Sequence, residues 1–200
     1  MDIQIGLRET LIAAALRILE TESEEPTLRS VARAAGVSAM APYRHFPDKA
    51  GLMAAVANRG FEMLRSVLVI ADDKPDPREA VFAQGMAFID FARANPALFR
   101  LMYSHQYGHA GIDAVRDTYD VLARRIASIL PMHAVTAATL ACRSLVQGMA
   151  TIELAGRLAP AERDDVAVAL GLFVSGLGAG LEQRINSATP SRRVCPGRSD

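Results

Sequence analysis

The chain has 200 residues, of which half are hydrophobic and none is tryptophan, and its 22 basic side chains balance its 22 acidic ones. This length fits one domain or two small ones, and the lack of alternating β-branched runs beside abundant alanine, leucine and arginine excludes a sheet protein and predicts an all-helical fold. The long uncharged run over residues 166–181 is shorter than the roughly 18–20 residues that span a bilayer, so we expect a buried helix there and no membrane partner.

The start of the chain and its cysteines both indicate a cytoplasmic protein. Asp2 and Glu9 stand where a signal peptide would have a basic region followed by an apolar core. Cys142 lies within an apolar helical pattern and Cys195 in a polar terminal stretch, so we expect no structural disulfide. A reduced, cytoplasmic setting follows as the expectation.

The first expected helix covers residues 7–22, because Leu11, Ala15 and Ile18 recur on one helical face. An acidic stretch, residues 20–25, separates it from the next element.

Residues 27–49 predict two short helices joined by a tight turn. Thr27 can cap the first helix, and Gly36 can end it in a left-handed conformation. Ser38 can cap a second helix that runs through Tyr43 to His45, before Phe-Pro at 46–47 closes it. This is the shape of a helix-turn-helix, whose second helix enters the major groove of DNA. The segment is also locally basic, with four basic side chains against one aspartate, so it can neutralise phosphates.

Gly36-Val-Ser, followed by Tyr43-Arg-His-Phe-Pro-Asp-Lys49, resembles the DNA-binding domain of TetR-family transcriptional regulators over about residues 8–60. The resemblance implies that the first helix packs across the helix-turn-helix and holds it rigid. It also implies that the helix starting at Asp48 and running towards Ile70 links this domain to the rest of the chain. Spacing and charge then select the expected DNA-contacting residues, which are Thr27, Arg29, Ser38, Ala39, Met40, Pro42, Tyr43, Arg44, His45 and Lys49.

A break dense in aspartate and proline, residues 71–77, is the best candidate for a domain boundary. Four further helices are predicted over 77–93, 112–130, 134–157 and 160–185. A fifth begins after Asn95, which is its N-cap, has Pro96 at its first position and runs to residue 103. We therefore expect about nine helices in two parts: a helix-turn-helix domain with its linking helix over 1–70, and a larger ligand-binding and dimerisation domain over 77–186. A tail without fixed structure is expected over 187–200.

The last predicted helix is rich in glycine, which costs roughly 1 kcal/mol per residue relative to alanine in a helix interior. Such a cost suggests that another helix approaches closely, and a partner subunit is the natural source of that helix. The expected interface residues are Gly171, Gly176 and Gly180. The TetR resemblance implies the same, since those proteins dimerise through their last two long helices.

A weaker resemblance covers residues 95–103 and 145–154, which are similar to a TetR subgroup that has a tryptophan and a His-Gly pair in this helix. Here Arg143 stands at the tryptophan position, and Gln147 precedes Gly148 in place of the histidine.

Bulky apolar residues on several helices are expected to form mostly core, but also to line a cavity for a largely apolar effector. The expected pocket residues are Phe61, Met86, Phe88, Asp90, Phe91, Met102, Tyr103, Tyr119, Gln147 and Met149. Arg143 and Glu153 are further candidate polar groups, although an internal salt bridge between them is an equally good interpretation.

No cofactor, metal site or enzymatic activity is expected. His105 and His109 are four apart, but glycine lies between them and no third ligand is near, so a loop pair without metal is favoured. No nucleophile elbow or catalytic triad pattern is present in the sequence.

Together these patterns predict a homodimeric repressor that a small apolar effector releases from a palindromic operator in double-stranded DNA. A ligand-dependent activator of the same family is the alternative within this class. A helical small-molecule carrier or enzyme is the alternative from another class.

Overall fold

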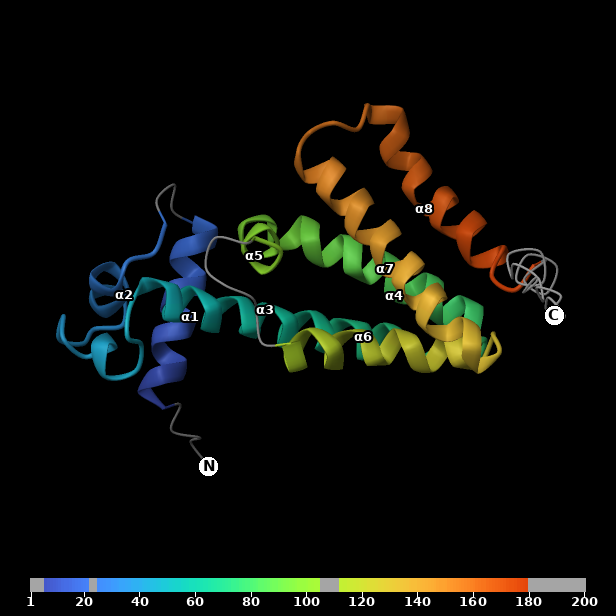
Figure 1. Ribbon diagram of the computed structural model, residues 1–200. Coiled ribbons are helices and arrows are strands. Elements are labelled where there is room, and N and C mark those ends of the chain that lie inside the picture. The colour runs from blue at the N-terminus through green and yellow to red at the C-terminus, as the bar shows by residue number, and fades with distance from the viewer. Residues whose placement is uncertain (1–5, 22–24, 105–111, 180–200) are drawn as a thin grey trace, which may run out of the picture.

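The computed structural model describes residues 6–21, 25–104 and 112–179, and these contain eight α-helices, one 3₁₀ helix and no strand, so the expected all-helical class is confirmed. The helices are α1 (Leu7–Thr21), α2 (Leu28–Ala34), η1 (Pro42–Arg44), α3 (Lys49–Ala71), α4 (Pro77–Ala94), α5 (Pro96–Met102), α6 (Ile112–Ala127), α7 (Met132–Leu154) and α8 (Pro160–Ser175). A small lobe holds α1, α2, η1 and the start of α3, and the remaining helices form a larger lobe beside it (Figure 1). None of the described helices is long and apolar enough to cross a membrane.

Helix α3 joins the two lobes. Asp48 caps it, because its carboxylate accepts a hydrogen bond from the backbone N–H of Gly51 at 2.8 Å. Its buried face includes Leu52, Val56 and Leu64, which are fully enclosed. The helix packs against α1 at its start and between α4 and α6 further along. One continuous hydrophobic core therefore runs through both lobes.

In the helix-turn-helix segment, the expected caps of the first helix are present, but the expected second helix is not. Thr27 and Ser30 form a capping box at the start of α2, and Gly36 has a φ of +69° just after its end. The expected α-helix from Ser38 to His45 is wrong, since only a turn and the 3₁₀ helix η1 form there. Pro42 explains the difference: it has no N–H to donate to the carbonyl of Ser38, which instead accepts from Ala41 at 2.9 Å.

The N-terminal end of helix α5 is capped by a side chain of another helix. Asn95 was expected to cap it, but the Asn95 side chain donates to the carbonyl of Phe91 and makes no cap bond. The carboxylate of Glu20 on α1 takes that place, accepting from the backbone N–H of Leu98 at 2.7 Å and of Ala97 at 3.4 Å.

The same helix also lies very close to α3 at Gly60. A Cβ built on Gly60 would stand 2.6 Å from the sulfur of Met102 and 3.0 Å from a methyl carbon of Leu98. Glycine is thus required at this point for α3 and α5 to approach, and α5 is fixed to both α1 and α3.

The last helix is shorter than expected. Helix α8 ends at Ser175, with Gly176 as its C-cap and Gly178 at a φ of +86° in the turn that follows. These glycines therefore end the helix and do not lie in its interior, so the expected helix over 160–185 is wrong. Gly180 and the tail from 187 lie outside the described residues.

Candidate nucleic-acid interface and ligand cavities

One face of the small lobe is hollowed by a groove of about 520 Å³ between the start of α2, η1 and the start of α3. Four of the expected DNA-contacting residues line it: Thr27, Arg29, Tyr43 and Lys49. Tyr43 is about half exposed, at 51%, so its ring and hydroxyl are accessible from outside. The start of α3 also lines the groove, and the N-terminal end of a helix is a place where an anion is stabilised. An aromatic ring, two cationic side chains and a helix N-terminus thus line a groove that suits a phosphate backbone.

The other expected DNA-contacting residues lie on the turn and on η1. Ser38, Ala39 and Met40 are exposed on the turn, and Arg44 and His45 are exposed at the end of η1. These residues remain predicted contacts.

Pro42 differs from the rest of the set because it is buried. It was expected on the exposed front of the second helix, where it would contact base edges. Its burial makes it a structural residue that supports the turn, so its expected exposed position is wrong.

Lys49 has an acidic neighbour that spacing along the chain did not predict. Its ammonium lies 2.5 Å from the carboxylate of Glu25, which precedes α2. In the sequence, Glu25 is recognisable only as part of the acidic stretch between the first two helices, because 24 positions separate it from Lys49. The contact places one negative charge beside the groove, against the local basic excess.

Within the larger lobe, a narrow cavity of about 10 Å³ lies between α3, α4, α6 and α7. Its lining is mostly apolar, with three polar side chains and one thiol: Leu68, Gln84, Gly85, Phe88, Tyr119, Leu122, Cys142, Arg143 and Val146. Of the expected pocket residues, Phe88 and Tyr119 line this cavity. Burial raises the pKa of the Cys142 thiol to about 11, so it stays protonated at neutral pH.

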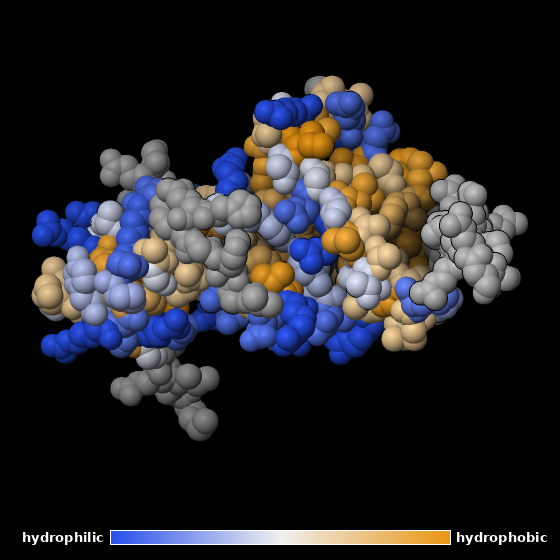
Figure 2. Space-filling model, viewed as in Figure 1, coloured by the Kyte–Doolittle hydropathy of each residue, from blue (hydrophilic) through white to orange (hydrophobic). Residues whose placement is uncertain are grey.

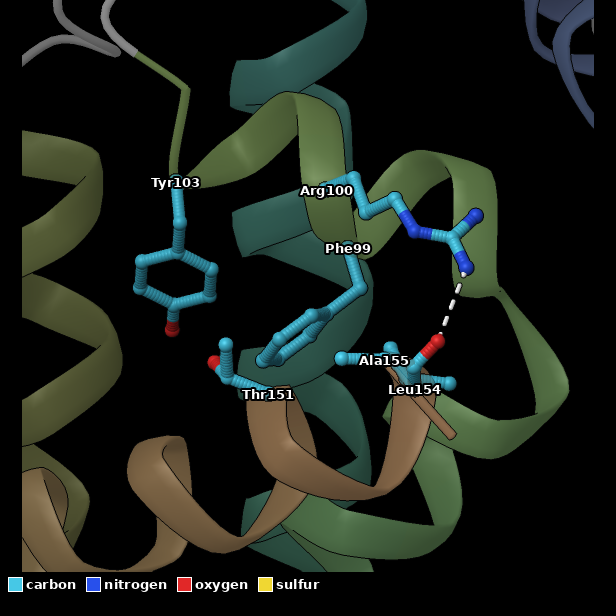
Figure 3. Close-up of a pocket in the computed structure, with 6 residues that line it drawn as sticks. All are labelled: Phe99, Arg100, Tyr103, Thr151, Leu154 and Ala155. Carbon is cyan, nitrogen blue, oxygen red and sulfur yellow. Dashed lines mark hydrogen bonds between the residues drawn. The ribbon is translucent and has the colours of Figure 1, made fainter. Parts of the chain in front are cut away.

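A larger groove of about 310 Å³ lies between α5 and the end of α7. Figure 3 shows its lining residues, which are Phe99, Arg100, Tyr103, Thr151, Leu154 and Ala155. Arg100 spans its edge and donates to the carbonyl of Leu154 at 3.2 Å. The ring of Tyr103 and the ring of Phe99 line the groove with aromatic surface, so it suits an apolar group.

An aromatic wall separates this groove from the narrow cavity. The hydroxyls of Tyr103 and Tyr119 are 2.7 Å apart, and Tyr103 also contacts the rings of Phe61, Phe88 and Phe99 with centroid distances of 5.7, 6.4 and 4.8 Å. Burial is the main cause that raises the pKa of both tyrosines above its ordinary value. Both hydroxyls therefore keep their protons at neutral pH.

The remaining expected pocket residues fall into two groups. Phe61, Phe91 and Met102 are buried in the core, with Met86 and Met149 packed against it. Gln147 is half-buried on α7 and lines neither of the two cavities, and its carbonyl accepts from the Thr151 hydroxyl.

Two of the expected polar groups are placed elsewhere. Asp90 is exposed and pairs with Arg93 at 2.9 Å, so its expected place in a pocket is wrong. Glu153 also pairs with Arg93, at 2.8 Å, and not with Arg143. The apolar pattern of the sequence could not show whether Glu153 pairs with Arg143 or with Arg93, because Arg93 and Glu153 are 60 positions apart.

The outer surface of α7 and α8 is unusually apolar. Leu140 and Ile152 on α7 are exposed, as are Val168 and Leu172 on α8. Figure 2 shows hydrophobic residues gathered over this part of the larger lobe. Gly171 lies on α8 next to the ring of Phe82, which a Cβ added at Gly171 would meet at 3.8 Å, so this glycine packs within the subunit.

His105 and His109 lie outside the described residues. Among the residues that the structure does describe, no three His, Cys, Asp or Glu side chains form a group able to hold a metal ion.

Comparison with known families matches both lobes. Residues 11–56 match the family of bacterial regulatory proteins of the tetR type, and residues 81–172 match the Tetracyclin repressor-like C-terminal domain. The first match includes α2, η1 and the start of α3, which line the groove of the small lobe. The second includes every residue that lines the narrow cavity of the larger lobe except Leu68.

Curated relatives match over part of their length. The nucleoid occlusion factor SlmA of Vibrio vulnificus is 31% identical over 122 residues, and the match spans 60% of this chain and 62% of that protein. An uncharacterised HTH-type transcriptional regulator of Mycobacterium tuberculosis is 34% identical over 95 residues, which is 47% of this chain and 48% of that protein.

Solved structures match over most of the chain. A Rhodococcus sp. RHA1 protein of unknown function is 30% identical with a TM-score of 0.74, covering 88% of this chain and 97% of that one. The transcriptional regulator SCO7222 of Streptomyces coelicolor, a TetR, shares the fold with a TM-score of 0.65 at 19% identity, covering 86% and 98% of the two chains.

Proposed function

Because the chain belongs to the TetR family of bacterial DNA-binding transcriptional regulators, we propose that it is a homodimeric repressor that a small effector releases from a palindromic operator. The observation that carries the proposal is the groove of the small lobe, where Arg29, Tyr43 and Lys49 meet the start of α3. This groove offers phosphate contacts, which position a protein on DNA without reading its sequence.

Sequence readout would come from the exposed turn and the end of η1. The turn presents small or apolar side chains at Ser38, Ala39 and Met40, which suit thymine methyl groups and DNA shape more than paired hydrogen bonds. Arg44 is the one long hydrogen-bond donor of η1, and it is exposed at the end of that helix. We assign it the direct reading of a base edge.

The apolar surface of α7 and α8 supports a dimer. Large apolar side chains at high exposure, such as Leu172 at 70%, are what a partner subunit covers. A second copy packed there would make a bundle of four helices. The two small lobes would then face half-sites about 34–36 Å apart, which is one turn of DNA.

The effector would bind in the larger lobe, at the aromatic wall between the α5–α7 groove and the narrow cavity. The cavity is nearly closed at about 10 Å³, so a ligand that enters must move helices apart. A ligand that binds better to the opened state draws the protein towards it, and DNA affinity falls if that state holds the small lobes at the wrong separation. In the activator alternative, the opened state is the one with the correct separation.

A gel-shift titration against the DNA that flanks its own gene tests the proposal. The wild-type protein should shift this DNA as a dimer, with an affinity that falls steeply as salt rises. The variant carrying Tyr43→Ala and Lys49→Ala should lose the shift while keeping its dimer and its helical circular-dichroism spectrum. A wild-type protein that leaves the DNA unshifted at low salt would contradict the assignment.

A further inference from the structure

The narrow cavity of the larger lobe holds a cation without a counterion. Arg143 on α7 lies over the ring of Tyr119 at 4.4 Å from its centroid. Among the described residues this guanidinium has no hydrogen bond and no ion pair, although arginine carries five N–H donors. A half-buried arginine whose donors are all unused is a recognition group that awaits an acceptor.

An acidic side chain bonded to Gln84, a residue of the cavity wall, is already neutralised. Asp72 accepts from Gln84 at 2.7 Å and from Arg125 at 2.6 Å, and the carbonyl of Asp72 accepts a second bond from Arg125. The Asp72–Arg125 pair therefore adds no net charge, and Arg143 leaves the cavity with one uncompensated positive charge.

The tyrosine pair adds a further unused donor. One of the two hydroxyls donates to the other across 2.7 Å, so one O–H proton of Tyr103 and Tyr119 has no acceptor among the described residues. Both groups stay protonated at neutral pH, since burial raises the pKa of each. The guanidinium and the spare hydroxyl proton thus form a donor-rich cluster around Tyr119.

A second observation marks the same cavity as incomplete. Gln84 is only 2% exposed, and its side-chain oxygen has no hydrogen-bond partner. A buried polar atom without a partner costs about 1–3 kcal/mol, so native structures seldom retain one without a reason. The cavity wall thus also carries one acceptor that the described chain leaves unused, beside the unused donors of Arg143 and the tyrosine pair.

From this cluster we infer that the effector is an amphipathic carboxylate, whose head group pairs with Arg143 and the Tyr103–Tyr119 hydroxyls and whose apolar body occupies the groove between α5 and α7. The inference rests on the proposed function, because it names the ligand class of the proposed effector site. A carboxylate matches the planar fork of one guanidinium. A phosphate head with two charges would be left with a single cation and a mostly apolar wall.

The groove sets the size of the body. Its volume of about 310 Å³ has room for on the order of ten methylene-sized groups, taking about 30 Å³ for each as for a water molecule. To reach Arg143 from this groove, the head group must break the Tyr103–Tyr119 hydrogen bond and replace it. Binding would therefore remove a hydrogen bond that links the C-cap residue of α5 to α6.

Calorimetric titration of the full-length dimer with straight-chain carboxylates from hexanoate to dodecanoate, each paired with its primary amide, tests the inference. The best carboxylate should bind about tenfold or more tightly than its amide, as expected when an acceptor of charged hydrogen bonds becomes neutral. Arg143→Met keeps the length of the side chain and should abolish this preference. Arg157→Met, the same change on an exposed arginine after α7, should retain it.

The inference is overturned if no carboxylate binds, if the amide binds as well as the acid, or if Arg143→Met keeps the preference. Tighter binding of dodecyl phosphate than of every carboxylate would also overturn it. The gel shift without ligand, run on the same preparations, separates this failure from failure of the proposed function. Arg143→Met should bind DNA like the wild type, which also shows that the variant folds.

Discussion

Neutralising Glu25 should strengthen DNA binding. Glu25 and Lys49 are 2.5 Å apart, so a phosphate held on the far side of the ammonium, at a hydrogen-bond distance of about 2.8 Å, would lie about 5 Å from the carboxylate. Two unit charges at about 5 Å repel by about 0.8 kcal/mol in bulk water and by about 3 kcal/mol at an effective dielectric constant of 20. Both side chains are more than a third exposed, at 38% and 48%, so solvent screening favours the lower value.

Glu25→Gln should therefore tighten operator binding by about fivefold at low salt, the equivalent of about 1 kcal/mol. Fluorescence anisotropy of a labelled operator duplex at roughly 50 and 200 mM salt measures the effect, which should shrink at the higher salt. Glu62→Gln is the matched control: it makes the same charge change on an exposed residue of α3, about 20 Å further along the helix. If the two variants change affinity equally, net charge explains the gain and the proposed repulsion at Lys49 is wrong.

The remaining predictions concern the groove, the packing of α5 and the subunit interface. Tyr43→Ala should weaken operator binding in anisotropy without changing the sedimentation of the dimer, and an unchanged affinity would remove Tyr43 from the contacts. Gly60→Ala should lower the free energy of unfolding in urea by about 1–3 kcal/mol because its Cβ meets Met102 at α5. A Gly60→Ala variant that unfolds at the same urea concentration as the wild type would refute the argument from close approach. Leu172→Glu should sediment as a monomer at micromolar concentration, whereas the control Ile70→Glu, equally exposed on α3, should remain a dimer.

Local rules predicted three helix ends, although they failed at Ser38, at Asn95 and at the end of α8. Thr27, Gly36 and Asp48 each act through neighbours within a few positions, and the structure bears out all three. The periodic apolar pattern likewise placed most helices, since burial on one face of a helix is legible at a spacing of three or four residues. The 3₁₀ conformation at η1 was missed because one proline outweighed a pattern that otherwise favours a helix.

Contacts between distant positions were not predictable in the same way. Arg93 has two acidic partners, Asp90 three positions away and Glu153 on another helix, and only the nearer is visible in the sequence. The pairing of Lys49 with Glu25 and the isolation of Arg143 depend on how helices pack, which one sequence does not specify. For this reason the sequence pattern indicated Arg143 as a candidate polar group of the cavity but did not indicate Gln84.

Glu20 connects α1 of the small lobe to α5 of the larger lobe, so movements of the two helices are coupled. Its carboxylate on α1 holds the first amides of α5, and α5 also supplies Phe99 and Tyr103 to the groove. A ligand that displaces α5 must carry α1 with it or break these hydrogen bonds, and DNA that immobilises α1 opposes the same displacement. By linkage, the factor by which a ligand weakens operator binding equals the factor by which the operator weakens ligand binding. Glu20→Gln, which keeps the acceptor oxygen but removes its charge, should reduce both factors together.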